Sequence, residues 1–202
     1  MKGSKPLLAL ACASIIAAAW GFGLGIEGYE HMRQPLALLG AAGMRGWHIA
    51  NLLLFVLPGL LVAMLAWRLR ASLREGSAWP LRMALQLGLL AALGFALQGV
   101  CNLDPARLPD DGANRLHALA WMAWWLVFAA SALALALVFA RGLPGGVRLA
   151  SFVAALLMPL GVLAAPVLWP AALAHRLGIA LWLGWWWMLA ASLNRGEASS
   201  PE

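Results

Sequence analysis

Six long runs of apolar residues, separated by short polar segments, make up most of the chain. A helix that crosses a bilayer needs about 20 mainly apolar residues, because lipid offers its backbone groups no other hydrogen-bonding partner. Runs of that length cover residues 7–26, 47–67, 83–101, 116–140, 147–169 and 171–193. The pattern predicts an all-α polytopic integral membrane protein, built as a bundle of six transmembrane helices.

These six spans leave no room for a soluble domain. We therefore expect residues 1–202 to form a single membrane domain, in which residues 194–202 are a short polar C-terminal tail. The segment 35–42 between the first two spans is too short to cross a bilayer and predicts a small interfacial helix. Pro58 lies inside the second span and predicts a kink, because proline cannot donate the backbone hydrogen bond that a helix needs there.

Composition supports the same class of protein. Hydrophobic residues make up 63% of the chain and charged residues 11%, whereas soluble domains average about 45–50% apolar and about 25% charged residues. The net charge of +6 does not indicate nucleic-acid binding, because the arginines are scattered over short loops without a basic stripe. Membrane lipids are the expected partners, and another membrane protein or a second copy of the chain would suit the same surface.

The first apolar run has two interpretations. Lysines near the start and the alanines at 17–19 resemble a signal peptide that is cleaved after Ala19. The apolar character continues to Ile26, however, which favours a span that is retained.

Lysines and arginines predict the orientation, because they are retained on the cytoplasmic side. With the N-terminus in the cytoplasm, that side holds nine: Lys2, Lys5, Arg68, Arg70, Arg74, Arg82, Arg141, Arg148 and Arg195. The outer side then holds five: Arg33, Arg45, Arg107, Arg115 and Arg176. This split predicts a multi-pass protein of the bacterial inner (cytoplasmic) membrane, with both termini in the cytoplasm.

The four histidines, His31, His48, His117 and His175, all fall on the outer side or at an outer helix end. His48, His117 and His175 open three of the spans and Asp104 follows another, so these four residues would share one depth. Three imidazoles and a carboxylate suit zinc or a similar divalent ion. We therefore take His48, Asp104, His117 and His175 as candidate metal ligands, and Asp104 and His117 as candidate catalytic residues. Their neighbours Asn51, Gln98 and Asn102 would line the same pocket.

Simpler interpretations stand beside this one. Each histidine could bond to headgroups, water or a helix end, and Asp104-Pro105 is a common turn former. Twelve tryptophans are present, and some lie below His117 and His175 on the same helical faces. They predict either an aromatic-walled cavity or ordinary packing, and packing is favoured.

Several short motifs resemble the bacterial and archaeal membrane proteins grouped as domain of unknown function 998. They are the residues 35–41, the run Asn51-Leu52-Leu53-Leu54-Phe55-Val56-Leu57-Pro58-Gly59-Leu60-Leu61, and Asn102-Leu103-Asp104-Pro105 followed by His117. The resemblance implies a six-helix membrane protein and says little about activity. Members carry a second histidine three residues before the position of His117, where this chain has Asn114.

Three classes of function remain open. The first is a non-catalytic or accessory membrane protein whose outer polar residues are structural. The second is a metal-assisted hydrolase or lipid-modifying enzyme, in which Asp104 would be ligand or base. The third is a b-type haem protein that takes two axial ligands from His48, His117 and His175. The first is favoured, and haem is the less favoured cofactor.

Overall fold

The computed structural model describes residues 4–73, 75–107, 112–138 and 144–198. Within these ranges the chain forms helices and no strands, which confirms the all-α prediction. The helices, in chain order, are α1 (Ser4–Leu24), α2 (Trp47–Asn51), the π-helix η2 (Leu52–Val56), α3 (Leu57–Ala71), α4 (Trp79–Val100), α5 (Gly112–Ala136), α6 (Gly145–Leu168) and α7 (Ala171–Ala198).

Two short 3₁₀ helices lie in the connections. The first, η1 (Leu36–Gly40), falls within the segment 35–42 and confirms the short helix predicted there. The second, η3 (Pro105–Arg107), follows α4. The C-terminal tail was predicted to begin at residue 194, but α7 continues through residues 194–198. Residues 199–202 lie outside the described part of the chain.

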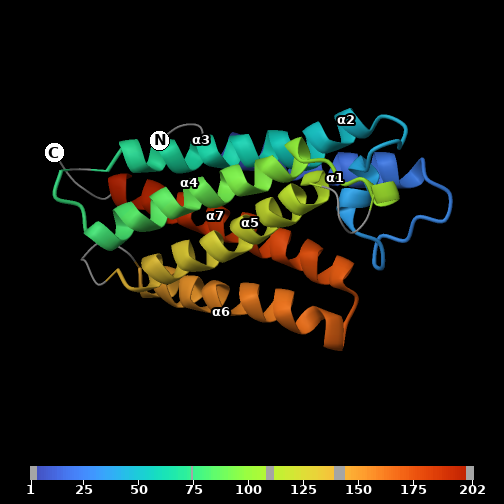
Figure 1. Cartoon of the computed structure of the whole chain (residues 1–202). Coiled ribbons are helices and arrows are strands. Elements are labelled where there is room, and N and C mark those ends of the chain that lie inside the picture. The colour runs from blue at the N-terminus through green and yellow to red at the C-terminus, as the bar shows by residue number, and fades with distance from the viewer. Residues whose placement is uncertain (1–3, 74, 108–111, 139–143, 199–202) are drawn as a thin grey trace.

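The long helices run side by side along one axis (Figure 1). Each of α3 to α6 packs on the next helix in the chain, and α1 packs on α3. The contact between α1 and α7 is much thinner. The start of α1 and the end of α7 lie at one end of the bundle, which also carries the connection between α3 and α4.

Five helical segments are long and apolar enough to cross a membrane: Ser4–Leu24, Trp47–Ala71, Trp79–Val100, Gly112–Ala136 and Gly145–Ala164. The sixth long helix, α7, does not reach the same apolar character in its described residues. It contains His175, Arg176 and four tryptophans, and the indole N–H makes tryptophan less apolar than leucine.

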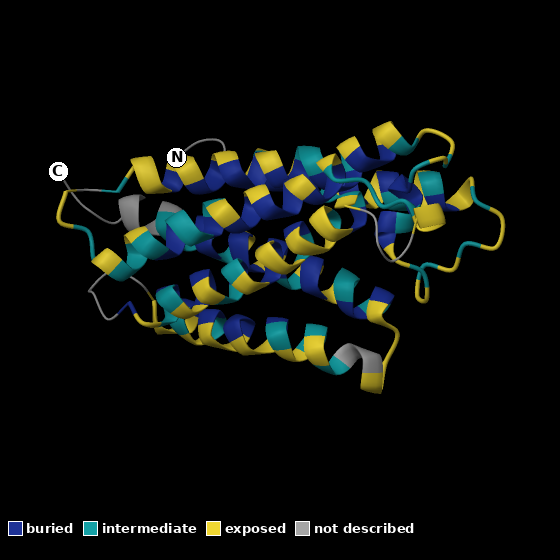
Figure 2. Cartoon of the chain, in the orientation of Figure 1, coloured by how far each residue is buried: buried dark blue, intermediate teal, exposed yellow. Residues whose placement is uncertain are grey.

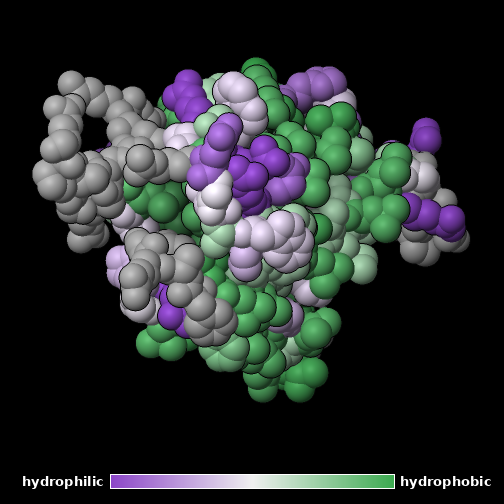
Figure 3. Space-filling view, turned by 90° about the vertical axis from the view of Figure 1, so that its left-hand side faces the viewer, coloured by the Kyte–Doolittle hydropathy of each residue, from purple (hydrophilic) through white to green (hydrophobic). Residues whose placement is uncertain are grey.

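The side of the bundle is largely apolar. Exposed residues follow its whole length (Figure 2), and many of them are large hydrophobics, among them Leu156, Leu160 and Leu163 on α6. At the end that carries the start of α1, hydrophilic residues gather near the middle and hydrophobic ones surround them (Figure 3). Lys5, Arg70 and Arg82 belong to this end, whereas Lys2, Arg74 and Arg141 lie outside the described residues. This distribution suits a bundle surrounded by lipid.

Pro58 is accommodated by a change of helix type. Because proline has no N–H, the carbonyl one turn earlier loses its usual partner. The chain meets this with the π-helix η2 just before Pro58, in which Leu57 N–H bonds to Leu52 O, five residues back. The predicted irregularity is thus a widened turn that joins α2 to α3.

Aromatic side chains fill the centre of the bundle. The ring of Phe95 on α4 lies 5.2 Å from that of Trp124 on α5 and 4.7 Å from that of Trp182 on α7. Trp124, Trp182 and Trp186 are fully buried. Trp124 and Trp182 therefore take part in packing, as the favoured interpretation of the tryptophans predicted. Small residues allow close approach elsewhere, and a Cβ added to Gly59 on α3 would lie 2.7 Å from the Ala96 nitrogen of α4.

Candidate functional site

The candidate residue His117 lies in the second turn of α5 and contacts the end of α4. Its Nδ1 is 3.0 Å from Gln98 O and 2.8 Å from Cys101 O. Carbonyl oxygens only accept hydrogen bonds, so Nδ1 is the donor to both. The last carbonyls of a helix have no partner within that helix. His117 therefore caps the C-terminus of α4.

Asp104 and Asn114 hold the connection between α4 and α5 together. The backbone N–H of Asp104 donates to Oδ1 of Asn114 at 2.8 Å, and Nδ2 of Asn114 donates to the backbone oxygen of Asp104 at 3.0 Å. The carboxylate of Asp104 accepts a bond from the Ala106 nitrogen and lies 3.4 Å from Nε of Arg107. Both side chains thus stabilise the local turn. Asn114 occupies the position at which the family resemblance had suggested a second histidine.

Asn51 ties three segments together. Its Nδ2 donates to Gly40 O at 2.7 Å and to Oδ1 of Asn102 at 3.0 Å. Gly40 has to be a glycine for this contact, because a Cβ there would overlap the Asn51 amide. The predicted neighbours Asn51 and Asn102 therefore do meet, and they link η1, α2 and the end of α4.

His48 lines a small pocket together with Asn51 and Asn102, as predicted, whereas His175 and the Gln98 side chain do not line it. His48 is exposed and its ring stacks on that of Trp47, with the ring centroids 3.4 Å apart. The ring of His175 lies 5.5 Å from that of Trp124, inside the bundle. Its Nε2 and the amide of fully buried Gln98 have no hydrogen-bond partner among the described residues.

The predicted metal ligands are not assembled into one site. Within the described ranges, no three His, Cys, Asp or Glu side chains are grouped so that they could hold a metal ion. Asp104 and His117 do lie at the same end of the same hairpin, but each bonds to nearby backbone groups. This pair is therefore part of the joint between α4 and α5.

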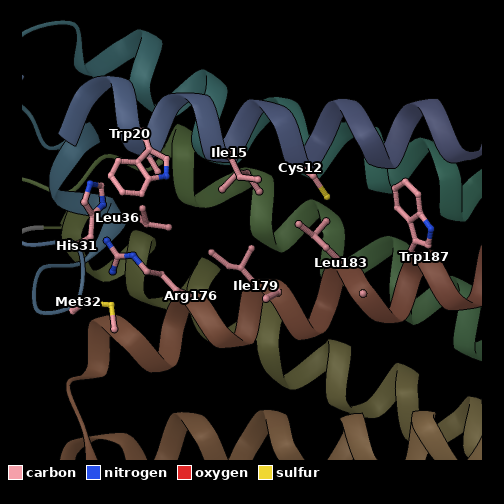
Figure 4. Close-up of a pocket in the computed structure, with 14 residues that line it drawn as sticks. Cys12, Ile15, Trp20, His31, Met32, Leu36, Arg176, Ile179, Leu183 and Trp187 are labelled. Atoms are coloured by element: carbon pink, nitrogen blue, oxygen red, sulfur yellow. The ribbon is translucent and has the colours of Figure 1, made fainter. Parts of the chain in front are cut away.

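A cavity lies between α1 and α7, two long helices that make few contacts with each other (Figure 4). Its volume is about 590 Å³, within the range of about 300–1,000 Å³ that is usual for ligand pockets. We call it the α1–α7 groove. It is lined by Cys12, Ile15, Ile16, Ala19, Trp20, His31, Met32, Leu36, Arg176, Ile179, Ala180, Leu183, Gly184 and Trp187.

The groove has a buried floor and an exposed rim. Ile15 and Ile179 on the floor are 8% and 5% exposed, whereas Ile16 and Trp20 on the rim are 59% and 58% exposed. The groove therefore opens at the side of the bundle and not at its centre. Nearly all of its lining is apolar, which suits a hydrocarbon chain.

Arg176 provides the permanent charge of the groove. Nη1 donates to Gln34 O at 2.9 Å and to Ala172 O at 3.0 Å, and Nη2 donates to the Tyr29 hydroxyl at 2.9 Å. These bonds hold the half-buried guanidinium at one end of the groove, next to the loop between α1 and η1 (Figure 4). All three acceptors are neutral oxygens.

Tyr29 and His31 complete this end. The Tyr29 hydroxyl lies 3.2 Å from Pro35 O, to which it donates, while it accepts the bond from Arg176. Burial raises the pKa of Tyr29, and the nearby Arg176 cation acts in the opposite direction. The His31 ring packs 4.7 Å from that of Trp20, and Gly23 makes room for it, since a Cβ there would lie 2.7 Å from Cε1 of His31.

The α1–α7 groove was not predicted from the sequence. Arg176 was counted among the outer charges and His31 among the outer histidines, and no role was predicted for Cys12 or Trp20. One signal was available, because Arg176 lies inside an apolar run, and charged residues within membrane helices usually mark functional positions. The helices α1 and α7 are distant in sequence, so their pairing had no local signal.

No family model, curated protein or solved structure matches the chain. The resemblance to domain of unknown function 998 therefore stays a prediction.

Proposed function

We propose that this protein is a non-catalytic, six-helix protein of the bacterial inner membrane that holds the hydrocarbon chain of a membrane lipid in the α1–α7 groove. The observation that carries the proposal is the groove itself, which has an apolar floor and opens at the side of the bundle. A lipid chain can enter such a groove from the bilayer without crossing a polar surface.

The dimensions of the groove support a lipid chain. Arg176 and Trp187 line it at opposite ends (Figure 4). At about 1.5 Å of rise per residue, the eleven residues from one to the other extend over about 16 Å. Half of a hydrocarbon core that is about 30 Å thick is about 15 Å. One groove length thus matches the depth of a single leaflet.

The proposal takes α7 as the sixth span. Six crossings place the start of α1 and the end of α7 on the same side, which agrees with their common end in the bundle (Figure 1). With the termini in the cytoplasm, Arg176 and His31 face the outer leaflet. The outer residues Asp104, Asn114 and His117 then have a structural role, because they bond to backbone groups of the connection between α4 and α5 and of the end of α4.

The test is to fill the groove with a side chain. A Cβ added to Gly184, which lines the groove, meets no atom within 4 Å, so Gly184→Leu can be accommodated and would occupy the space. Gly21→Leu is the matched control, because Gly21 on α1 is equally open and does not line the groove. Each purified variant is analysed for bound lipid by native mass spectrometry in a mild detergent.

We expect the wild-type protein and Gly21→Leu to retain a lipid, and Gly184→Leu to lose it. A second control is Gly161→Leu, which fills a separate apolar cavity between α6 and α7 and should not affect retention. Equal retention by all four proteins, or absence of lipid from the wild type, would contradict the proposal.

A further inference from the structure

We propose that the α1–α7 groove selects lipids with an anionic headgroup, whose phosphate or carboxylate oxygens bind Arg176. This inference rests on the proposed function, since it requires that a lipid chain occupies the groove. It adds the chemical class of the headgroup, which the apolar lining alone does not specify.

The first argument is the charge of Arg176. Its hydrogen bonds go to two carbonyls and one phenol, and no carboxylate is paired with it among the described residues. Glu30 lies in the loop between α1 and η1, but its carboxylate is paired with Arg33 on the exposed surface. A cation next to lipid without a counter-ion is unfavourable, so an anion at this end of the groove would be stabilised.

The second argument is the donor geometry. A guanidinium has five N–H donors in a rigid fork that matches carboxylate and phosphate oxygens. The described protein contacts use both hydrogens of Nη1 and one of Nη2. Nε–H and the second Nη2 hydrogen remain for a ligand. The three protein contacts also fix the orientation of the fork, so little conformational freedom would be lost when a headgroup binds.

The third argument is position. Arg176 lies five residues after the first residue of α7, about 7–8 Å along the helix axis. Its side chain extends toward the loop between α1 and η1, as its contacts with Tyr29 and Gln34 show. Long cationic side chains in membrane helices commonly extend in this way toward the headgroup layer. The cation is thus placed where the headgroup of a lipid would lie if its chain followed the groove.

The experiment is a competition between lipids of identical chains. Protein in mixed micelles with equal amounts of phosphatidylglycerol and diacylglycerol, which has the same chains but no phosphate, is analysed by native mass spectrometry, and the ratio of the two retained lipids is measured. A charge-assisted hydrogen bond corresponds to about tenfold or more in affinity, and we expect an enrichment of phosphatidylglycerol of that order. Arg176→Gln should retain lipid with a ratio near one.

Two further variants separate charge from folding. Ala180 lines the groove one turn after Arg176, so Ala180→Glu supplies an internal carboxylate and leaves the Arg176 contacts in place. It should abolish the enrichment, whereas Ala180→Gln should keep it. Arg33→Gln removes an exposed arginine near the same end and should also keep it.

The outcomes distinguish the two proposals. If wild-type protein retains both lipids equally, the selection of anionic headgroups is overturned and the groove proposal stands. If Arg176→Gln and Ala180→Glu keep the full enrichment, Arg176 does not recognise the headgroup and the inference is also overturned. If the wild type retains no lipid at all, the proposed function itself fails.

Discussion

Replacement of His117 should weaken the joint between α4 and α5. In His117→Ala the carbonyls of Gln98 and Cys101 lose the Nδ1 donor that lies 3.0 and 2.8 Å from them. A buried polar group left without its partner costs about 1–3 kcal/mol. Cys101 is only half-buried, so water can replace part of the loss, and we expect the lower half of that range.

The assay is thermal unfolding in detergent micelles, followed by circular dichroism. For a chain of this size, 1 kcal/mol changes Tm by about 2–4 °C, so His117→Ala should lower Tm by about 2–8 °C. His117→Asn keeps an amide N–H near the position of Nδ1 and should recover most of the loss. His48→Ala is the control, because His48 is exposed and its change should stay within about 0.5 kcal/mol.

Two results would refute this reasoning. One is a Tm for His117→Ala that equals that of His48→Ala, since the cap would then contribute nothing. The other is a fall in the wild-type Tm on addition of a chelator, which would show that a metal ion and not the α4 cap is the stabilising partner of the outer residues.

Three other predictions use the same protein. Gly59→Ala should destabilise the bundle by about 1–3 kcal/mol, because the added Cβ would lie 2.7 Å from backbone and side-chain atoms of Ala96. The control Gly21→Ala should not destabilise it, and equal Tm values for the two variants would contradict the close approach of α3 and α4. Tyr29 is the single tyrosine, so ultraviolet titration should show that it ionises above the ordinary pKa of tyrosine, and Arg176→Gln should raise this pKa further. The contribution of Tyr29 to the free energy of unfolding is present below its pKa in the unfolded chain and is lost as pH rises through its pKa in the folded protein. The first span should be retained, and a mature N-terminus at Trp20 in intact-mass measurement would disprove it.

The helices were predictable because lipid restricts the choice of structure. An apolar run of bilayer length has to satisfy its backbone groups internally, and a helix does so within the segment. The second span, predicted as 47–67, extends over residues 47–71, and the fourth, predicted as 116–140, begins at Gly112 and ends at Ala136. The ends shifted because polar residues such as Asn114 continue a helix outside the apolar run.

Asp104, His117 and Asn102 were correctly predicted to lie at a common end of the bundle, but their partners were not predictable. A helix end leaves several carbonyls unsatisfied, and which side chain bonds to them depends on how the helices pack. His117 was within reach of the end of α4, so it became a cap and not part of a metal site. The α1–α7 groove depends on the pairing of the first and last long helices, which hydrophobic periodicity does not encode.

Photo-crosslinking can locate a lipid chain between α1 and α7. A lipid with a diazirine in the middle of its acyl chain is reconstituted with the protein, illuminated, and its attachment sites are mapped by mass spectrometry. Labels should concentrate on the groove residues Cys12, Ile179 and Leu183, well above the exposed Leu156 and Leu163 of α6, which line neither the groove nor the cavity between α6 and α7. Labels on α6 at the same frequency, with the groove residues unmarked, would contradict a lipid chain in the groove.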